Sequence, residues 1–328
     1  MASLAELRQK LKDQETKRGT KSSGSADKSN FPFWDMNEND SATVRFLPDA
    51  NTDNTFFWVE KQQIKIPFSG IVGMNSKPTV VTVPCVEMWG ESCPIHQEIR
   101  PWFKDPSLEK LARTYWKKRS YIFQGLVRKS PLVEQELPEN PIRKFTFGSQ
   151  IFNLVKSSLL DPEMENIPTD YLNGTDFQIT KLMKGQYADY ATSKWARKES
   201  SLTEEEFQAI QTYGLYDLSK FLPAKPDAEA LAAIFEMFEE SVEGKEYDPQ
   251  RWGKYYRPYG VEVPTNTSVS VPVSKPEPKT TVSSSSVIED DNDDLPWEDT
   301  TKPVEPVKSA SNAQDIIALI RARQNSGN

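Results

Sequence analysis

The chain has 328 residues, with 40 Lys and Arg against 48 Asp and Glu, and its net charge at pH 7 is −8. Its mean hydropathy of −0.64 is low for a chain that is packed throughout, but 34 of the 35 aromatic residues fall between positions 31 and 260. We therefore expect one folded core in that segment, and no run of 18 apolar residues exists that would span a membrane.

Residues 1–20 are predicted to form an N-terminal arm. Leu4, Leu7 and Leu11 recur at helical spacing, which favours a short amphipathic helix over residues 3–15. Such a helix is too short to be stable alone, so it needs a partner surface. The stretch 17–29 is rich in Lys, Gly and Ser, which is typical of a flexible hinge, and we place this hinge at 21–30. The first residues lack the apolar run of a secretory signal, so we expect an intracellular protein.

Short segments with β-branched, aromatic or alternating apolar residues follow from Phe31 onward. They predict strands at 41–48, 55–68, 79–84, 120–128, 143–148 and 176–183. Helical spacing appears around 106–116 and again at Leu231, Ile234, Phe235 and Phe238. Strands with inserted helices indicate an α+β fold over residues 31–260, built as a barrel or a sandwich.

Both cysteines and the single histidine of the chain, Cys85, Cys93 and His96, fall within twelve residues. In an intracellular chain such residues are typical of metal ligands or free thiols. Thiolate and imidazole are donors that zinc prefers, and a closed structural zinc site needs four ligands. The fourth ligand stays open between Glu87, Glu91, Asp53, Glu60 and water, and packing without a metal is the alternative.

Basic and aromatic residues alternate along the segment 100–129. It carries nine Lys and Arg against two acidic residues, with six aromatic residues among them. Cations that follow a phosphate backbone beside rings that stack on bases are typical of proteins that bind single-stranded nucleic acid. A solvated helix followed by a strand with ordinary core aromatics explains the same pattern. The similar segment 251–260 either lines the same surface or packs across the core.

Catalysis is not expected, because the sequence has no Gly-rich phosphate loop, no nucleophile elbow and no histidine besides the candidate ligand. The segment 261–310 is rich in Pro, Ser and Thr and is predicted to be a disordered linker. Inside it, residues 289–299 hold seven acidic groups and no basic one. Apolar residues at helical spacing predict a docking helix in the last segment, 311–328.

Several of these motifs, in the same order along the chain, resemble the single-stranded DNA-binding, helix-destabilising proteins of T4-like bacteriophages. The resemblance rests on an acidic tail and on five pieces of sequence: SATVRFLPDAN at 41–51, the Cys85 to Cys93-Pro-Ile-His96 cluster, KKRSY at 117–121, RKFTFG at 143–148 and GQYADYATSKW at 185–195.

The resemblance implies an oligonucleotide-binding (OB) type β-barrel core over 31–260, with a small zinc-type subdomain at about 55–100. It implies zinc on Cys85, Cys93 and His96, although the histidine ligand that the family has before its first cysteine has no counterpart near Lys61 or Gln62. It also implies that DNA is contacted by a basic and hydroxyl run and by a set of aromatic rings. These residues are Lys117, Lys118, Arg119 and Ser120, followed by Tyr121, Phe123, Phe145, Phe152, Tyr187 and Tyr190.

We therefore expect a protein that coats single-stranded DNA cooperatively and without sequence preference during phage DNA replication, recombination and repair. By the same resemblance it acts in the cytoplasm of the infected host cell, its arm binds a neighbouring copy, and its acidic tail recruits replication and recombination proteins. The alternatives are a zinc-ribbon-type adaptor that binds RNA or protein, and a metal-dependent nuclease.

Overall fold

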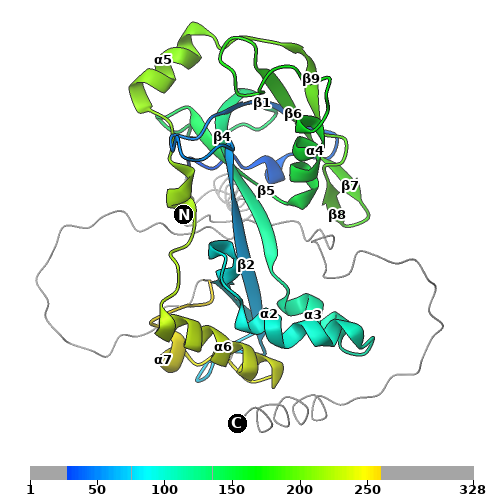
Figure 1. Cartoon of the computed structure of the whole chain (residues 1–328), viewed down its shortest axis with the longest axis vertical. Helices are drawn as coiled ribbons and strands as arrows, with labels where there is room; N and C mark the ends of the chain where they lie inside the picture. The colour runs from blue at the N-terminus through cyan, green and yellow to red at the C-terminus, as the bar shows by residue number, and fades with distance from the viewer. Residues whose placement is uncertain (1–27, 75, 135, 260–328) are drawn as a thin grey trace, which may run out of the picture.

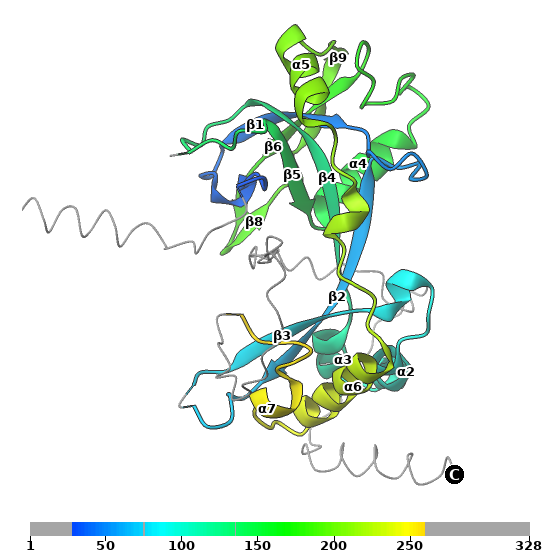
Figure 2. The same ribbon diagram turned by 90° about the vertical axis from the view of Figure 1, so that its left-hand side faces the viewer.

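The computed structural model describes residues 28–74, 76–134 and 136–259. They form two lobes, an upper and a lower one, which two long antiparallel strands connect (Figure 1). These strands are β2 (Trp58–Phe68) and β4 (Lys118–Lys129). The perpendicular view shows the same separation of the lobes (Figure 2).

The main sheet has seven strands, all paired antiparallel, in the order β3-β2-β4-β1-β6-β9, with β5 paired to β4 outside this path. Its other strands are β1 (Ser41–Leu47), β3 (Thr79–Pro84), β5 (Ile142–Phe147), β6 (Thr175–Thr180) and β9 (Lys194–Glu199). A separate hairpin consists of β7 (Leu182–Lys184) and β8 (Tyr187–Asp189). The α+β class is confirmed, but the pairings found among the described residues leave the sheet open and do not close a barrel.

Strand β4 connects the sheet because it pairs with three strands along its length. Its first half pairs with β2, its second half pairs with β1, and its central residues pair with β5 on the other side. Gly125 lies where β4 leaves the neighbourhood of β2 and enters that of β1. A Cβ atom there would overlap the carbonyl oxygen of Arg45, so this close approach of two backbones requires glycine.

The core of the upper lobe is aromatic. Phe46 of β1 is fully buried and lies at ring-centroid distances of 5.0–6.1 Å from six other rings. These rings belong to Phe57, Phe123, Phe145, Phe147, Phe177 and Trp195. Helix α4 (Ser149–Leu159) packs Ile151 and Val155 into the same core. Helix α5 (Glu204–Tyr213) begins at a capping box formed by Thr203 and Glu206.

The lower lobe packs helices against the far end of β2 and against β3. Its helices are α2 (Pro94–Ile99), α3 (Glu109–Tyr115), α6 (Ala228–Val242) and α7 (Pro249–Trp252), with short 3-10 turns η2 (Val86–Trp89) and η3 (Arg100–Lys104). The predicted helical spacing from Leu231 to Phe238 is confirmed in α6, where Ile234 and Phe238 are buried. Trp252 is 1% exposed and packs against Phe68 and Tyr247, so the segment 251–260 contributes to the lower core.

All six predicted strands are present within a few residues of their predicted ends. The sequence does not predict β8, β9, α2, α4, α5 or α7. Strand β9 has the sequence KWARKE at the edge of the sheet, where the polar composition hides the alternation. The predicted helices at 3–15 and 311–324, and the acidic segment 289–299, lie outside the described residues. No helix within the described ranges is long and apolar enough to cross a membrane.

Candidate nucleic-acid interface and metal cluster

The paired segments 58–63 of β2 and 118–123 of β4 connect the two lobes, and we call them the neck. Side chains alternate along a strand, and directly paired residues point to the same side of an antiparallel sheet. The register Gln62 to Arg119 and Lys61 to Ser120 therefore divides the predicted basic and hydroxyl run between two faces. Arg119 and Tyr121 lie on one face, and Lys118 and Ser120 lie on the other.

The face that carries Tyr121 also carries a continuous series of aromatic rings, which we call the ring row: Tyr121, Phe152, Trp58 and Phe56. Tyr121 stacks on Phe152 of α4 with centroids 3.5 Å apart and planes within 7°. Phe152 and Trp58 meet edge to face with ring centroids 5.4 Å apart, and the centroid of Trp58 lies 4.7 Å from that of Phe56. Exposure rises from 5% at Tyr121 to 58% at Phe56. The sequence reading missed Phe56 and Trp58, although the run Phe-Phe-Trp at 56–58 is visible in it.

Basic residues occupy both faces of the neck. Arg119 lies 3.4 Å from Glu60, and its side chain is 22% exposed. On the other face, Lys118 is half-buried and Ser120 is 5% exposed. Burial lowers the pKa of Lys61 on the same face, and no hydrogen bond or ion pair of the Lys61 side chain is found among the described residues.

Lys117, the first residue of the predicted run, is held by the Cys/His cluster. Its side chain is 11% exposed, and its Nζ atom lies 2.6 Å from Oε2 of Glu87. Its backbone N–H donates to Nε2 of His96 at 3.2 Å. In this arrangement Lys117 connects the beginning of β4 to the lower lobe.

Three of the predicted DNA-contacting rings, Phe123, Phe145 and Tyr190, are fully buried in the upper core. Burial, with a smaller contribution from Asp35, raises the pKa of Tyr190 to about 12. Base contacts by these three rings remain a prediction, and they would require the core to open. Tyr187, in contrast, is 70% exposed on β8.

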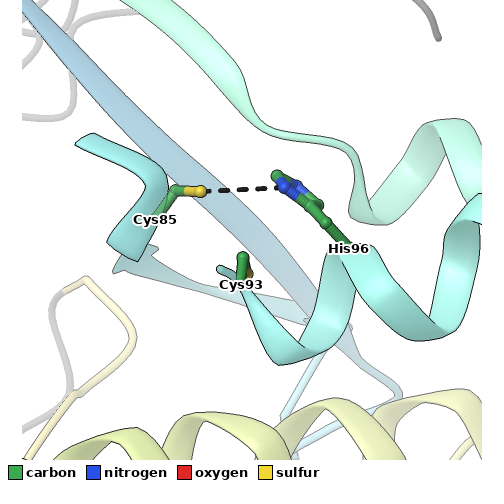
Figure 3. A group of neighbouring side chains, drawn as sticks. All are labelled: Cys85, Cys93 and His96. Atoms are coloured by element: carbon green, nitrogen blue, oxygen red, sulfur yellow. Dashed lines mark hydrogen bonds between the residues drawn. The ribbon is translucent and has the colours of Figure 1, made fainter. Parts of the chain in front are cut away.

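Cys85, Cys93 and His96 point toward one another from the end of β3 and the beginning of α2 (Figure 3). Cys85 directly follows β3, whereas Cys93 and His96 lie at the beginning of α2, where Pro94 occupies the first helical position. Their ligand atoms lie within 4.8 Å of one another, and all three residues are buried. Both cysteines are free thiols. Two thiols and an imidazole form a donor set that suits zinc, so the cluster can hold a metal ion.

Glu87 is the carboxylate that contacts this cluster, because its Oε1 lies 3.0 Å from Nδ1 of His96. Two of the other candidate fourth ligands are engaged elsewhere: Glu91 lies 2.5 Å from Lys225, and Glu60 lies beside Arg119. Asp53 lies in the exposed loop before β2. Among the carboxylates that the sequence left open, Glu87 is therefore the one that contacts the cluster, and it also pairs with Lys117.

The pKa shifts differ among His96, Cys85 and Cys93. Burial lowers the pKa of His96, although Glu87 opposes this effect. The hydrogen bond between the two thiols, together with burial, raises the pKa of Cys85, and the same hydrogen bond lowers the pKa of Cys93. Because Nε2 of His96 accepts the N–H of Lys117, the ring proton lies on Nδ1 and is donated to Glu87. A metal bound at Nδ1 requires the other tautomer, so it would release the hydrogen bond from Lys117.

A family model described as "gp32 DNA binding protein like" matches residues 38–239, which is more than half of the chain. The matched range includes the neck, the ring row and the Cys/His cluster. The matched family is one of DNA-binding proteins and not of enzymes. No curated protein matches the chain.

Proposed function

This chain belongs to the gp32-like family of DNA-binding proteins, and we propose that it binds and coats single-stranded DNA without sequence preference. The observation that carries the proposal is the family match over residues 38–239. We also propose that the curved upper sheet is an OB-type fold that has opened at one edge, and that the protein acts during phage replication, recombination and repair in the host cytoplasm.

The neck provides the physical support for this proposal. Cations that contact phosphates give affinity for any sequence, and rings that stack on bases hold those bases apart from a complementary strand. Arg119 and Lys118 supply charge at the neck, and the ring row supplies stacking surfaces beside Arg119. A net charge of −8 does not oppose binding, because the local field at the interface matters more than the total charge.

The test is a series of binding measurements at increasing salt, with labelled single-stranded and double-stranded DNA. The double variant Lys118→Ala/Arg119→Ala should weaken binding to all single-stranded sequences alike. The slope of log K against log salt should become shallower by about 0.7 for each phosphate that the variant no longer neutralises. Lys220→Ala is the matched control, since Lys220 is 77% exposed and lies outside the neck.

An unchanged salt slope in the double variant would contradict the assignment of the neck as the interface. Equal affinity for RNA and DNA strands would favour the RNA-binding adaptor instead. Cleavage of a labelled strand in the presence of magnesium would favour the nuclease.

We propose zinc as the metal of the Cys/His cluster, held by Cys85, Cys93 and His96, with Glu87 as the fourth ligand. When bound, zinc supplies a structural cross-link between the end of β3 and the beginning of α2. Purified protein should contain about one equivalent of zinc. Glu87→Gln should lower that content, and Glu91→Gln is the matched control because Glu91 pairs with Lys225. Protein that contains no zinc before any exposure to chelator would favour metal-free packing.

We propose that residues 1–20 make binding cooperative by docking on a neighbouring copy. Leu4, Leu7 and Leu11 supply an apolar stripe for that interaction. Deleting residues 1–20 should remove cooperativity on long strands and leave the affinity for a short oligonucleotide nearly unchanged. Equal cooperativity in the truncated protein would refute this role.

We propose that the tail recruits replication and recombination proteins and also competes with DNA. Seven acidic groups at 289–299 can occupy a basic surface when DNA is absent. Deleting residues 287–328 should raise the affinity for DNA, most strongly at low salt, and should abolish partner binding. An affinity at low salt no higher than that of the full chain would refute the competition.

A further inference from the structure

The exposed end of the ring row lies in the loop between β1 and β2. Phe56 is 58% exposed, whereas its neighbour Phe57 is 7% exposed and packs in the upper core. Exposing a large apolar ring to water is unfavourable. The loop around Phe56 nevertheless holds its backbone in place through hydrogen bonds.

Asn54 fixes the loop with three hydrogen bonds. Its Nδ2 donates to Oδ2 of Asp49 at 2.8 Å and to the carbonyl oxygen of Trp58 at 3.1 Å. Its Oδ1 accepts the backbone N–H of Phe56 at 3.0 Å. Asp49 in turn accepts the backbone N–H groups of Asn51 and Leu218. The backbone of Phe56 is therefore fixed by Asn54, which is itself bonded to Asp49 and to Trp58.

The ring of Phe56 continues a stack. Its centroid lies 4.7 Å from that of Trp58 with planes 32° apart, and Trp58 stacks on Phe123 of β4 at 5.7 Å. One side of Phe56 is thus occupied by an aromatic ring, and its exposed surface prolongs the series. A flat aromatic group of similar size is the ligand that such a surface fits best, and each unpaired base of a single strand presents a π-face.

We propose that Phe56 is a stacking platform for one unpaired base of single-stranded DNA, adjacent to the neck. This inference rests on the proposed function and extends the interface from the predicted residues to the β1–β2 loop. Asp49 and Asp53 lie in the same loop and repel phosphate, so the sugar-phosphate backbone runs on the side of Arg119 while the base faces Phe56. The interaction is independent of sequence, because all four bases stack.

The experiment uses the full chain and a labelled oligothymidylate, with affinity measured by fluorescence anisotropy. Phe56→Ala should weaken binding about 5- to 150-fold, the range that corresponds to the removal of one stacked base. The salt slope should stay unchanged, since the variant neutralises as many phosphates as the parent protein. Phe56→Tyr keeps a ring and should bind within about twofold of the parent protein.

Leu172→Ala is the matched control, because Leu172 is an exposed apolar residue at 72% and lies outside the ring row. It should bind like the parent protein. A bromouracil-substituted strand should also crosslink on irradiation to the peptide that contains Phe56, and Phe56→Ala should lose that crosslink.

The outcomes separate the two proposals. A parent protein that does not bind single strands refutes the proposed function and this inference with it. If the parent protein binds single strands, Phe56→Ala binds them equally well and the crosslink forms at another peptide, only the platform is refuted. Weakening of Phe56→Ala and Phe56→Tyr to the same extent also refutes it, because the ring would then not be the cause.

Discussion

The two lobes differ in the chemistry that packs them. In the upper lobe, strands contribute large rings that meet around Phe46, and packing depends on how these rings fit. In the lower lobe, aliphatic residues of β2, β3 and α6 pack together with aromatic rings, and the same core holds three groups that can bind a metal, with His96 stacked on Trp116. The upper lobe should therefore respond mainly to changes of ring size, and the lower lobe mainly to changes of ligand chemistry.

The lobes also differ in which parts of the chain build them. The lower core joins residues 64–116 to residues 233–252, so it includes α6 and α7 besides the predicted subdomain at 55–100. Ser241 of α6 contacts the hydroxyl of Tyr115 at 2.8 Å and donates to the carbonyl oxygen of Pro67. The lower lobe therefore consists of chain segments that come before and after most of the upper lobe in the sequence.

The largest expected effect is on the upper core. Phe46→Ala should lower the free energy of unfolding by about 3–5 kcal/mol, because it leaves a cavity among six rings. Phe207→Ala, at a ring that is 40% exposed, is the control and should cost far less. Unfolding in denaturant measures both changes.

Both cysteines lie in the lower core, so their reaction with a thiol reagent should stay slow in Phe46→Ala under native conditions. Fast thiol reaction there would show that the lobes are not independent.

Removing the proposed zinc should destabilise the lower lobe. Zinc that is a thousandfold above its dissociation constant stabilises a folded protein by about 4 kcal/mol. Chelation should therefore lower the unfolding temperature, speed the thiol reaction of both cysteines and shift the amide resonance of Lys117. Cys93→Ser should have the same effects, with Cys85 as the reacting thiol. A cluster that packs without metal would show none of these responses to chelator.

A smaller effect is expected at the ion network under α5, where Arg128 pairs with Asp176 at 2.9 Å and with Glu206 at 2.7 Å. Burial raises the pKa of Glu206, but hydrogen bonds from Arg128 and from the N–H of Thr203 outweigh it, and the net pKa is lowered below 4.5. A carboxyl whose pKa is lower in the folded state stabilises that state above pH 4.5, and this contribution is lost as pH falls through the folded pKa.

Glu206→Gln should consequently cost about 1–3 kcal/mol at pH 7 and progressively less in acid. Urea unfolding at several pH values measures the difference. Glu204→Gln, in the same first turn of α5, is the control. A cost for Glu206→Gln that is equal at all pH values would contradict the role of its charge.

The smallest effect on stability is expected at Tyr187. Tyr187→Ala should change the free energy of unfolding by less than about 0.5 kcal/mol, because the side chain is 70% exposed. If a base stacks there, binding of single-stranded DNA should weaken by about 1–3 kcal/mol. Tyr190→Ala provides the contrast, since its fully buried ring should cost stability first. Equal stability losses in the two variants would contradict the burial difference.

Local sequence was sufficient for six of the strand segments, the helix of Leu231 to Phe238 and the Cys/His cluster. Strand segments such as 79–84 have a period of two that follows from the backbone itself. The cluster was visible because the cysteines and the histidine are so few and so close in the chain. The family could be recognised for a similar reason, since ordered motifs remain readable before any tertiary packing is known.

Exposure of the candidate site residues depends on packing between distant parts of the chain. Alternating basic and aromatic residues do not show which rings face the core. The sequence therefore groups Phe123, Phe145 and Tyr190, which are buried, with Tyr187, which is exposed. Lys117 resembles Lys118 in sequence, but its partners Glu87 and His96 lie 30 and 21 residues away. Phe56 becomes conspicuous only when the turn of Asn54 holds it beside Trp58. Composition and period are local properties of a chain, whereas burial and pairing arise when β4 brings its three partner strands together.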